Sequence, residues 1–251
     1  MTEKVLITGA SGKIGMNLVR GFLEKDYDVI ALCYRSSSKK LLEQKFSNDP
    51  KLIAISIDLI AKNAVPNLVK QLVELDKLPT VLVNNARNLQ NIKVENHLKI
   101  SREKFLSEFL LGVEIPFELT MAFLEVRNSE LKIVINISSI YGLVVPNLTI
   151  YENESSSVPL HYGVAKAALN HLTKELAVRL ANRGVRVNAV AFGGVEGRSS
   201  PKFRNSYANL SPNQKMLSED DLFGPIEFLI SDKCNAITGE IVTVDGGWTL
   251  W

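Results

Sequence analysis

The sequence predicts a doubly wound α/β fold, in which helices cover both faces of a mostly parallel, seven-stranded sheet. Short apolar runs alternate with longer amphipathic segments along the 251 residues, as expected where strands alternate with helices. The apolar runs are continuous and rich in Val and Ile, which a sheet buried on both faces requires. No internal repeat, low-complexity segment or linker interrupts the sequence, so we expect a single domain over residues 1–251.

The individual elements follow from these runs. The first strand is expected at KVLITG, residues 4–9, and the first helix at IGMNLVRGFLEKD, residues 14–26. Further strands are expected at 27–34, 52–59, 80–85, 131–138, 185–192 and 239–247, and further helices near 61–77, 101–127, 161–183 and 218–231. Two stretches are expected to be loops: an insertion at about 142–160, and a substrate lid at about 193–217. Long loops in a compact domain are usually functional.

The composition is typical of a soluble globular protein, with 46% hydrophobic and 22% charged residues. A net charge of +2 gives no strong attraction to nucleic acid or membrane surfaces, so neither is expected as a partner. The two cysteines, Cys33 and Cys234, lie outside any metal-binding pattern, which favours a reducing, cytoplasmic compartment and no metal site. We expect neither a signal peptide before the first strand nor a membrane span, which needs roughly 18 consecutive apolar residues.

A glycine-rich turn, ITGASGKIG, joins the first strand to the first helix. Such a turn needs residues without a Cβ to make the bend, to let a pyrophosphate approach the backbone, and to pack the helix on the strand. The free N–H groups and positive dipole end of the helix then meet the phosphates. A glycine trio can also be a plain turn, but its place directly after the first strand favours nucleotide binding. The predicted cofactor contacts here are Gly9, Ser11, Gly12, Lys13, Ile14 and Gly15.

The end of the second strand bears on which nicotinamide cofactor is bound. NAD-binding folds usually place an acidic residue here for the ribose 2′-OH, and NADP-binding folds place an arginine. The segment ALCYRSSSKK contains no acid, whereas Arg35 can face a 2′-phosphate, with Ser36 and Ser37 as hydrogen-bond donors. NADP(H) is therefore favoured, with NAD(H) as the alternative, and Lys13 in the glycine turn adds to that preference. A solvated loop is the other interpretation of these residues.

Seven segments then resemble the short-chain dehydrogenase/reductase family, in the family's order and over essentially the whole chain. They are TGASGKIG (8–15), IDL (57–59), NNA (84–86), NISS (136–139), YGVAK (162–166), RVNAVAFGGV (186–195) and TGEIVTVDGGW (238–248). The resemblance implies a Rossmann-type oxidoreductase that uses NAD(P). It implies further cofactor contacts at Asp58, Leu59, Asn85 and Ala86, and at Gly193 and Val195 in the turn that faces the nicotinamide.

The chemistry implied by this resemblance centres on Tyr162 and Lys166. Transferring a hydride to a carbonyl requires a proton donor for the developing alkoxide, and a free tyrosine has a pKa of about 10. A lysine four residues later on a helix lies on the same face and lowers the pKa of the tyrosine. Tyr162 is therefore predicted to be the general acid/base, with Lys166 also holding the nicotinamide ribose. Ser139 is predicted to stabilise the oxyanion, although a strand end capped by Ser138 and Ser139 is the plainer interpretation.

Three positions depart from the family pattern. Arg87 stands where the family motif usually has glycine, and it either contacts an anionic substrate or points to solvent. Gly112 stands where the family often has an asparagine that helps a water relay reach the lysine; a backbone carbonyl or water could take its place. Phe192 replaces a customary proline before Gly193, which should alter the turn below the nicotinamide slightly.

The insertion is the best clue to the substrate. The interval between Ser139 and Tyr162 is longer than in the common members of the family, and the spacing of the glycines resembles the extended branch that acts on nucleotide sugars. This mixture resembles oxidoreductases of sugar and flagellin modification. Polar side chains of the insertion, among them Tyr151, Glu152, Asn153 and Glu154, suit a sugar or sugar nucleotide better than an acyl chain.

Two other functions remain open. The departures at Arg87 and Gly112 are compatible with a catalytically impaired, NADP(H)-binding regulatory protein, and a structural subunit without nucleotide is the third possibility. The resemblance also implies a homotetramer or homodimer. Helices 101–127 and 161–183 would pair at one interface and the C-terminal strand at another, where Trp248, Leu250 and Trp251 fit burial.

Overall fold

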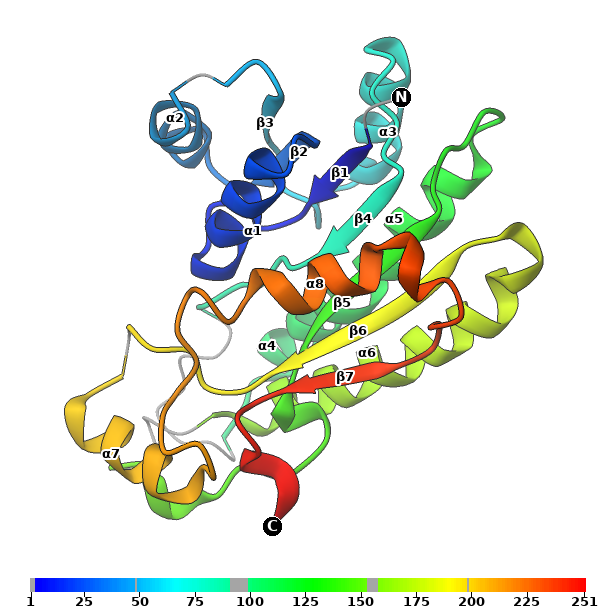
Figure 1. Ribbon diagram of the computed structural model, residues 1–251. Coiled ribbons are helices and arrows are strands. Elements are labelled where there is room, and N and C mark those ends of the chain that lie inside the picture. The colour runs from blue at the N-terminus through cyan, green and yellow to red at the C-terminus, as the bar shows by residue number, and fades with distance from the viewer. Residues whose placement is uncertain (1–2, 48, 91–98, 153–157, 198) are drawn as a thin grey trace.

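The computed structural model describes residues 3–47, 49–90, 99–152, 158–197 and 199–251 (Figure 1). Its centre is a seven-stranded sheet in the order β3-β2-β1-β4-β5-β6-β7. All the pairings between these strands are parallel, so the sheet expected to be mostly parallel is parallel throughout. The strands are β1 (Lys4–Ile7), β2 (Asp28–Cys33), β3 (Leu52–Ser56), β4 (Val81–Asn84), β5 (Ile133–Ser139), β6 (Arg186–Phe192) and β7 (Ile241–Val244).

Helices follow most of the strands. They are α1 (Lys13–Glu24), α2 (Ser36–Lys45), α3 (Ala64–Glu74), α4 (Arg102–Phe109), α5 (Ile115–Glu125), α6 (Leu160–Leu180), α7 (Pro201–Leu210) and α8 (Phe223–Ile230). The single helix expected at 101–127 is interrupted by a π-helical turn, Leu110–Glu114, between α4 and α5. No helix in the described ranges is long and apolar enough to cross a membrane. The same residues contain no group of histidine, cysteine or carboxylate side chains suited to a metal ion.

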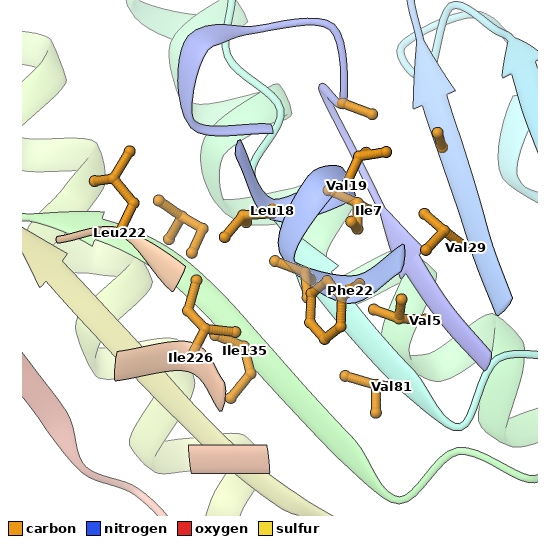
Figure 2. Packing of buried hydrophobic residues seen from close by; sticks show 14 of the residues in the cluster. Val5, Ile7, Leu18, Val19, Phe22, Val29, Val81, Ile135, Leu222 and Ile226 are labelled. Carbon is orange, nitrogen blue, oxygen red and sulfur yellow. The ribbon is translucent and has the colours of Figure 1, made fainter. Parts of the chain in front are cut away.

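The alternation of side chains along each strand produces two hydrophobic cores, one on each face of the sheet. Val5 and Ile7 of β1 belong to the core beneath α1, α2 and α8, whereas Leu6 belongs to the core beneath α3, α5 and α6. Figure 2 shows Leu18 and Phe22 of α1 in the first of these cores, together with strand residues and Ile226 of α8. The prediction of helices on both faces is therefore confirmed.

The strand order reverses direction beside β1, and this positions the site. The chain runs outward from β1 through β2 to β3, and then returns to place β4 on the other side of β1. In open parallel sheets, ligands bind in the crevice that forms at such a switch point, outside the carboxyl ends of the strands. The glycine turn follows β1 there, and residues 85–87 follow β4.

The predicted lid at 193–217 is only partly a loop, because it contains α7. Ser200 caps this helix by accepting a hydrogen bond from the backbone N–H of Phe203, and Pro201 occupies its first turn. Its inner face contributes Phe203 and the fully buried Tyr207 to a third hydrophobic cluster, which also contains Ile150 of the insertion and Trp248 near the C-terminus. The lid, the insertion and the C-terminal turn therefore pack together.

Candidate active site

Tyr162 lies in the first turn of α6, buried opposite the carboxyl end of β5. Ser139 is the last residue of β5, and its hydroxyl interacts with the Tyr162 oxygen by a hydrogen bond. Ser139 also accepts a hydrogen bond of 3.2 Å from the backbone N–H of Tyr141, which fixes the orientation of its side chain. The long insertion between them thus leaves the serine and the tyrosine side by side.

Lys166 follows one helical turn after Tyr162 and is also buried. Its ammonium nitrogen lies 6.0 Å from the centre of the Tyr162 ring and donates a 2.7 Å hydrogen bond to the backbone carbonyl of Ile137. Burial lowers the pKa of Lys166, because removing the ammonium group from water disfavours its charge, whereas Tyr162 acts in the opposite direction. The structure brings the three predicted catalytic residues together.

The tyrosines of this region differ in their electrostatic surroundings. Burial raises the pKa of Tyr162, but the positive charges of Arg87 and Lys166 and the hydrogen bond with Ser139 outweigh burial, so that the net pKa is lowered. Tyr141 and Tyr151 instead share a 2.8 Å hydrogen bond between their hydroxyl groups. Burial is the main cause that raises the pKa of Tyr141 well above its usual range and that of Tyr151 to about 12. Of the three tyrosines, Tyr162 is the one whose pKa is lowered.

Arg87 contacts Tyr162, an arrangement that its sequence position left open. Its guanidinium carbon lies 3.9 Å from the centre of the Tyr162 ring, so the cation covers one face of that ring. Arg87 is exposed at its outer side. The buried Glu108 of α4 is a second group that sequence reasoning missed; its negative charge raises the pKa of both Tyr162 and Lys166. Nothing in the pattern of α4 distinguished Glu108 from the exposed glutamates around it.

The glycine turn is packed against the segment that follows β4. Gly9 has a φ of +63°, and a Cβ there would lie 2.8 Å from the Cα of Ala86. A Cβ on Gly15 would lie 2.4 Å from the carbonyl oxygen of Gly9, so helix and turn approach as closely as the sequence predicts. The side chain of Asn85 donates hydrogen bonds of 2.9 and 3.1 Å to the carbonyls of Thr8 and Gly9. Gly12 caps α1 without a side-chain hydrogen bond, as an anion-binding helix start requires.

The other predicted cofactor residues lie at the carboxyl edge of the sheet. Arg35 is the exposed cap of α2, and Ser36 is its first residue. The ammonium group of Lys13 donates a hydrogen bond to the carbonyl of Glu196 in the loop after β6, so its contact with a cofactor stays a prediction. The remaining residues are Ser11 and Ile14 in the glycine turn, Asp58 and the buried Leu59 after β3, Gly193 at the end of β6, and Val195, which forms a bridge with Leu217.

A small cavity of about 10 Å³ lies beside Lys166, where Gly112 replaces the expected asparagine. Its walls include Thr8, Asn84, Ala86, Gly112, Ile115 and Lys166. Asn84 donates its amide N–H to Asn136, but its carbonyl oxygen has no hydrogen-bond partner among the described residues. The cavity has about the volume that one water molecule needs, so the glycine leaves room for a water between Asn84 and Lys166.

The insertion and the lid are joined by aromatic and polar contacts. The rings of Tyr151 and Phe203 lie 5.1 Å apart, and Tyr207 stacks on Trp248 at 5.5 Å. Ser200 donates a 2.6 Å hydrogen bond to the carboxylate of Glu152. Glu152 and Tyr151 thus contact the lid, while Asn153 and Glu154, also predicted to face the substrate, lie outside the described residues.

The fold and this arrangement define a class of protein: Rossmann-type oxidoreductases that bind NAD(P) across the switch point of a parallel sheet. A family profile described as enoyl-(acyl carrier protein) reductase matches residues 9–249. The chain belongs to the short-chain dehydrogenase/reductase family. It is an NAD(P)-dependent oxidoreductase that acts on CH–OH groups.

Relatives of different activity resemble the chain over nearly its whole length. Post-translational flagellin modification protein A of Campylobacter coli is 27% identical over 98% of both chains. The 3-oxoacyl-[acyl-carrier-protein] reductase FabG of Staphylococcus aureus is 29% identical, again over 98% of both.

Solved structures show the same fold with different cofactors. A short-chain dehydrogenase from Leptospira borgpetersenii with bound NAD+ has a TM-score of 0.87 and 28% identity, over 99% of this chain and 93% of the other. A 4-hydroxyisoleucine dehydrogenase complexed with NADH has a TM-score of 0.86 and 28% identity, over all of both chains. ElxO with NADP bound has a TM-score of 0.84 and 26% identity, also over all of both chains. The relatives therefore bind either cofactor.

Proposed function

We propose that the protein transfers a hydride between NADP(H) and a polar, sugar-like carbonyl or alcohol, with Tyr162 as the general acid/base. The observation that carries this proposal is the lowered pKa of Tyr162, in contrast to the raised values of Tyr141 and Tyr151. A phenol of lowered pKa releases its proton more readily than an ordinary phenol, as a general acid/base requires. The family membership supplies the reaction class, and the electrostatics of the site support the role of this one tyrosine.

The nicotinamide, when bound, supplies or accepts the hydride, and the residues of the chain handle the proton. In reduction, the Tyr162 hydroxyl gives its proton to the carbonyl oxygen as that oxygen becomes an alkoxide. The hydroxyl of Ser139 donates a hydrogen bond to the same oxygen and stabilises its developing charge. Lys166 and Arg87 stabilise the phenolate that remains on Tyr162. In oxidation the same phenolate removes the proton of the alcohol.

The preference for NADP(H) is supported by the residues at the end of β2. Arg35 stands exposed at the start of α2, where its guanidinium group can pair with a 2′-phosphate. The same segment has no carboxylate between Asp28 and Glu43 to bind a ribose 2′-OH. NAD(H) is the alternative, and the ratio of kcat/KM with NADPH to that with NADH tests the choice.

The sugar-like substrate is supported by the polar side of the insertion and by the similarity to a flagellin modification protein. An acyl thioester is the competing substrate, because FabG is about equally similar. Rates with a panel of keto sugars, nucleotide sugars and 3-oxoacyl thioesters distinguish the two. A rate on the thioesters alone would refute the sugar-like assignment.

The experiment that tests catalysis compares the wild type with Tyr162→Phe. We expect kcat/KM to fall by about 10²–10⁴-fold, the usual contribution of a positioned acid or base, while NADPH still quenches protein fluorescence. Tyr27→Phe, in the turn between α1 and β2 at the other end of the strands, is the matched control and should retain activity. Equal activity of wild type and Tyr162→Phe would refute the assignment. NADPH binding without turnover on any panel would instead favour an impaired, regulatory protein, for which the cavity at Gly112 beside Lys166 is the supporting observation.

We further propose one domain that forms a cytoplasmic homotetramer or homodimer. Apolar side chains are exposed along the helices expected to pair, including Leu106 of α4 at 55%, Phe117 of α5 at 45% and Val178 of α6 at 79%. At the C-terminus, Trp248 is buried inside the chain, but Leu250 and Trp251 are 79% and 78% exposed. Covering such surface stabilises an oligomer. Light scattering tests this, and a monomeric mass would refute it.

A further inference from the structure

Arg87 is held rigidly at its backbone although its side chain reaches the surface. It follows Ala86, whose N–H donates a 2.9 Å hydrogen bond to the hydroxyl of Thr8. The hydroxyl of Thr8 also accepts a 2.9 Å hydrogen bond from the N–H of Asn85. The backbone that leads into Arg87 is therefore joined to the glycine turn by hydrogen bonds, and the guanidinium group lies over the face of the Tyr162 ring.

The guanidinium group has no anionic partner within the described part of the chain. None of the salt bridges or hydrogen bonds among those residues includes Arg87. Glu108 is the carboxylate that acts on the site, but no ion pair joins it to Arg87. Among the described residues, the charged groups that act on Tyr162 are Arg87, Lys166 and Glu108, and the two basic residues lower its pKa more than the carboxylate raises it.

Within the residues that the structure describes, the N–H donors of Arg87 have no hydrogen-bond acceptor. The guanidinium carbon lies over the Tyr162 ring, and the N–H bonds of a guanidinium group lie in its plane and point outward from its edge. This edge matches the spacing of two oxygens of a carboxylate or phosphate. Because the guanidinium carbon is only 3.9 Å from the ring centre, an anion on that edge lies close to the point where Tyr162 exchanges its proton.

We propose that Arg87 is a substrate-binding residue, and that the substrate carries a carboxylate or phosphate close to the carbon that exchanges the hydride. With reacting atoms about 3–3.5 Å apart, the anionic group and this carbon are separated by on the order of two to four bonds. This proposal rests on the proposed function for the identity of the reacting carbon. The binding of the anion itself depends only on Arg87.

Matched pairs of probes test the substrate class. Acetoacetate and methyl acetoacetate differ by a carboxylate, and dihydroxyacetone phosphate and dihydroxyacetone differ by a phosphate. We expect the wild type with NADPH to prefer the charged member of one pair by at least tenfold in kcat/KM, and the pair that shows the preference identifies the anion. In Arg87→Met this ratio should fall by about 10- to 100-fold, the range expected for losing charge-assisted hydrogen bonds. Arg87→Lys should recover part of it, because lysine keeps the charge but lacks the planar fork.

A control variant separates local from general effects of charge. Arg127 is exposed just beyond the end of α5, and Arg127→Met removes the same charge away from the site. We expect it to keep the wild-type ratio. Equal rates of the wild type on the charged and neutral members of both pairs would overturn the proposal while leaving the proposed function intact.

A second measurement does not require turnover. The ionisation of Tyr162 is followed by absorbance near the phenolate band, as the difference between the wild type and Tyr162→Phe, with saturating NADP+ so that the cofactor phosphates fill their own site. Added inorganic phosphate or malonate should move this titration to higher pH in the wild type, because the bound anion offsets the charge of Arg87. Arg87→Met should show no such change. A change in the wild type without any catalysis would support the anion site and reject the proposed function.

The competing role of Arg87 is contact with the cofactor. In that case Arg87→Met weakens the binding of NADPH in the absence of substrate, and the ratio between charged and neutral probes stays as in the wild type. Dissociation constants from NADPH fluorescence, measured for both proteins, decide this point. Weakened cofactor binding with an unchanged ratio would overturn the proposal.

Discussion

Arg87→Met changes the electrostatics of Tyr162 with little change in volume near the ring. The substitution removes the cation 3.9 Å from the ring centre and keeps an apolar side chain in its place. Because the positive charge of Arg87 lowers the pKa of Tyr162, its removal raises that pKa. Oxidation of an alcohol requires the phenolate, so the rising limb of the pH profile for oxidation should move to higher pH. Reduction requires the protonated phenol, which the substitution favours.

The size of this effect follows from the distance and the exposure. Two unit charges about 4 Å apart interact by about 4 kcal/mol at an effective dielectric constant of about 20, and by about 1 kcal/mol in bulk water. Arg87 covers a buried ring but is exposed on its other side, so solvent screening leaves about 1–2 kcal/mol. At a fixed pH on the rising limb, the fraction of phenolate should then fall about 5- to 30-fold.

The assay is the pH dependence of kcat/KM for oxidation of a neutral alcohol, which avoids any contribution from an anionic substrate. Arg87→Met should be slower than the wild type by this factor on the rising limb, where Tyr162 is mostly protonated in both proteins, and should approach wild-type rates as the pH rises. Arg87→Lys keeps the charge and should keep most of the profile, while Arg127→Met should match the wild type. A rate reduced equally at every pH would refute the electrostatic reasoning, since a lost binding contact alone leaves the shape of the profile unchanged.

Three further substitutions test the cofactor site and the core. Gly9→Ala places a Cβ 2.8 Å from the Cα of Ala86 at a φ of +63°. We expect the free energy of unfolding, measured by urea denaturation, to fall by at least about 1–2 kcal/mol and the binding of NADPH to weaken. Wild-type values of both would contradict the close packing of the turn. Arg35→Glu should reverse the preference from NADPH to NADH in kcat/KM, and an unchanged ratio would remove Arg35 from the 2′-phosphate site. Phe22→Ala leaves a cavity in the core beneath α1, so the free energy of unfolding should fall by about 3–5 kcal/mol. The catalytic rate below the melting temperature should stay close to that of the wild type. A fall of less than about 1 kcal/mol in the free energy of unfolding would contradict the packing.

The strands could be predicted from the sequence because each is a continuous apolar run, and the sheet needs such runs wherever both of its faces are covered. α2 and α7 were missed because neither depends on a broad apolar face. α2 begins with three serines and buries only Leu42, and α7 buries only Tyr207. The start of α7 nevertheless carries a signal in the sequence, because Ser200 and Pro201 are typical of the N-cap and first position of a helix. Pattern reasoning based on periodicity gave these local signals too little weight.

The candidate site was predictable to the extent that it follows from motifs. Ser139, Tyr162 and Lys166 could be named because they lie in segments that resemble motifs of the short-chain dehydrogenase/reductase family. Contacts between side chains of distant segments could not be predicted, because no sequence motif includes both residues of such a contact. The position of Arg87 over Tyr162 depends on how the chain leaves β4, and Glu108 is buried just before the π-helical turn, which no sequence pattern indicated.

The two departures from the family pattern that flank the catalytic pair can be understood together. Gly112 and Ala86 line the same cavity beside Lys166, and Arg87 is the next residue after Ala86. Glycine at 112 removes a side chain that could hydrogen-bond near the lysine, and burial disfavours the charged form of that lysine. A lysine with a lowered pKa is charged for a smaller fraction of the time, so it stabilises the phenolate of Tyr162 less. Arg87 supplies a second cation to the same phenol from the segment after β4, and burial depresses the charge of an arginine less readily than that of a lysine. We infer that the arginine offsets the glycine, so that Gly112→Asn should restore part of the oxidation rate lost in Arg87→Met, whereas independent effects of the two substitutions would contradict this coupling.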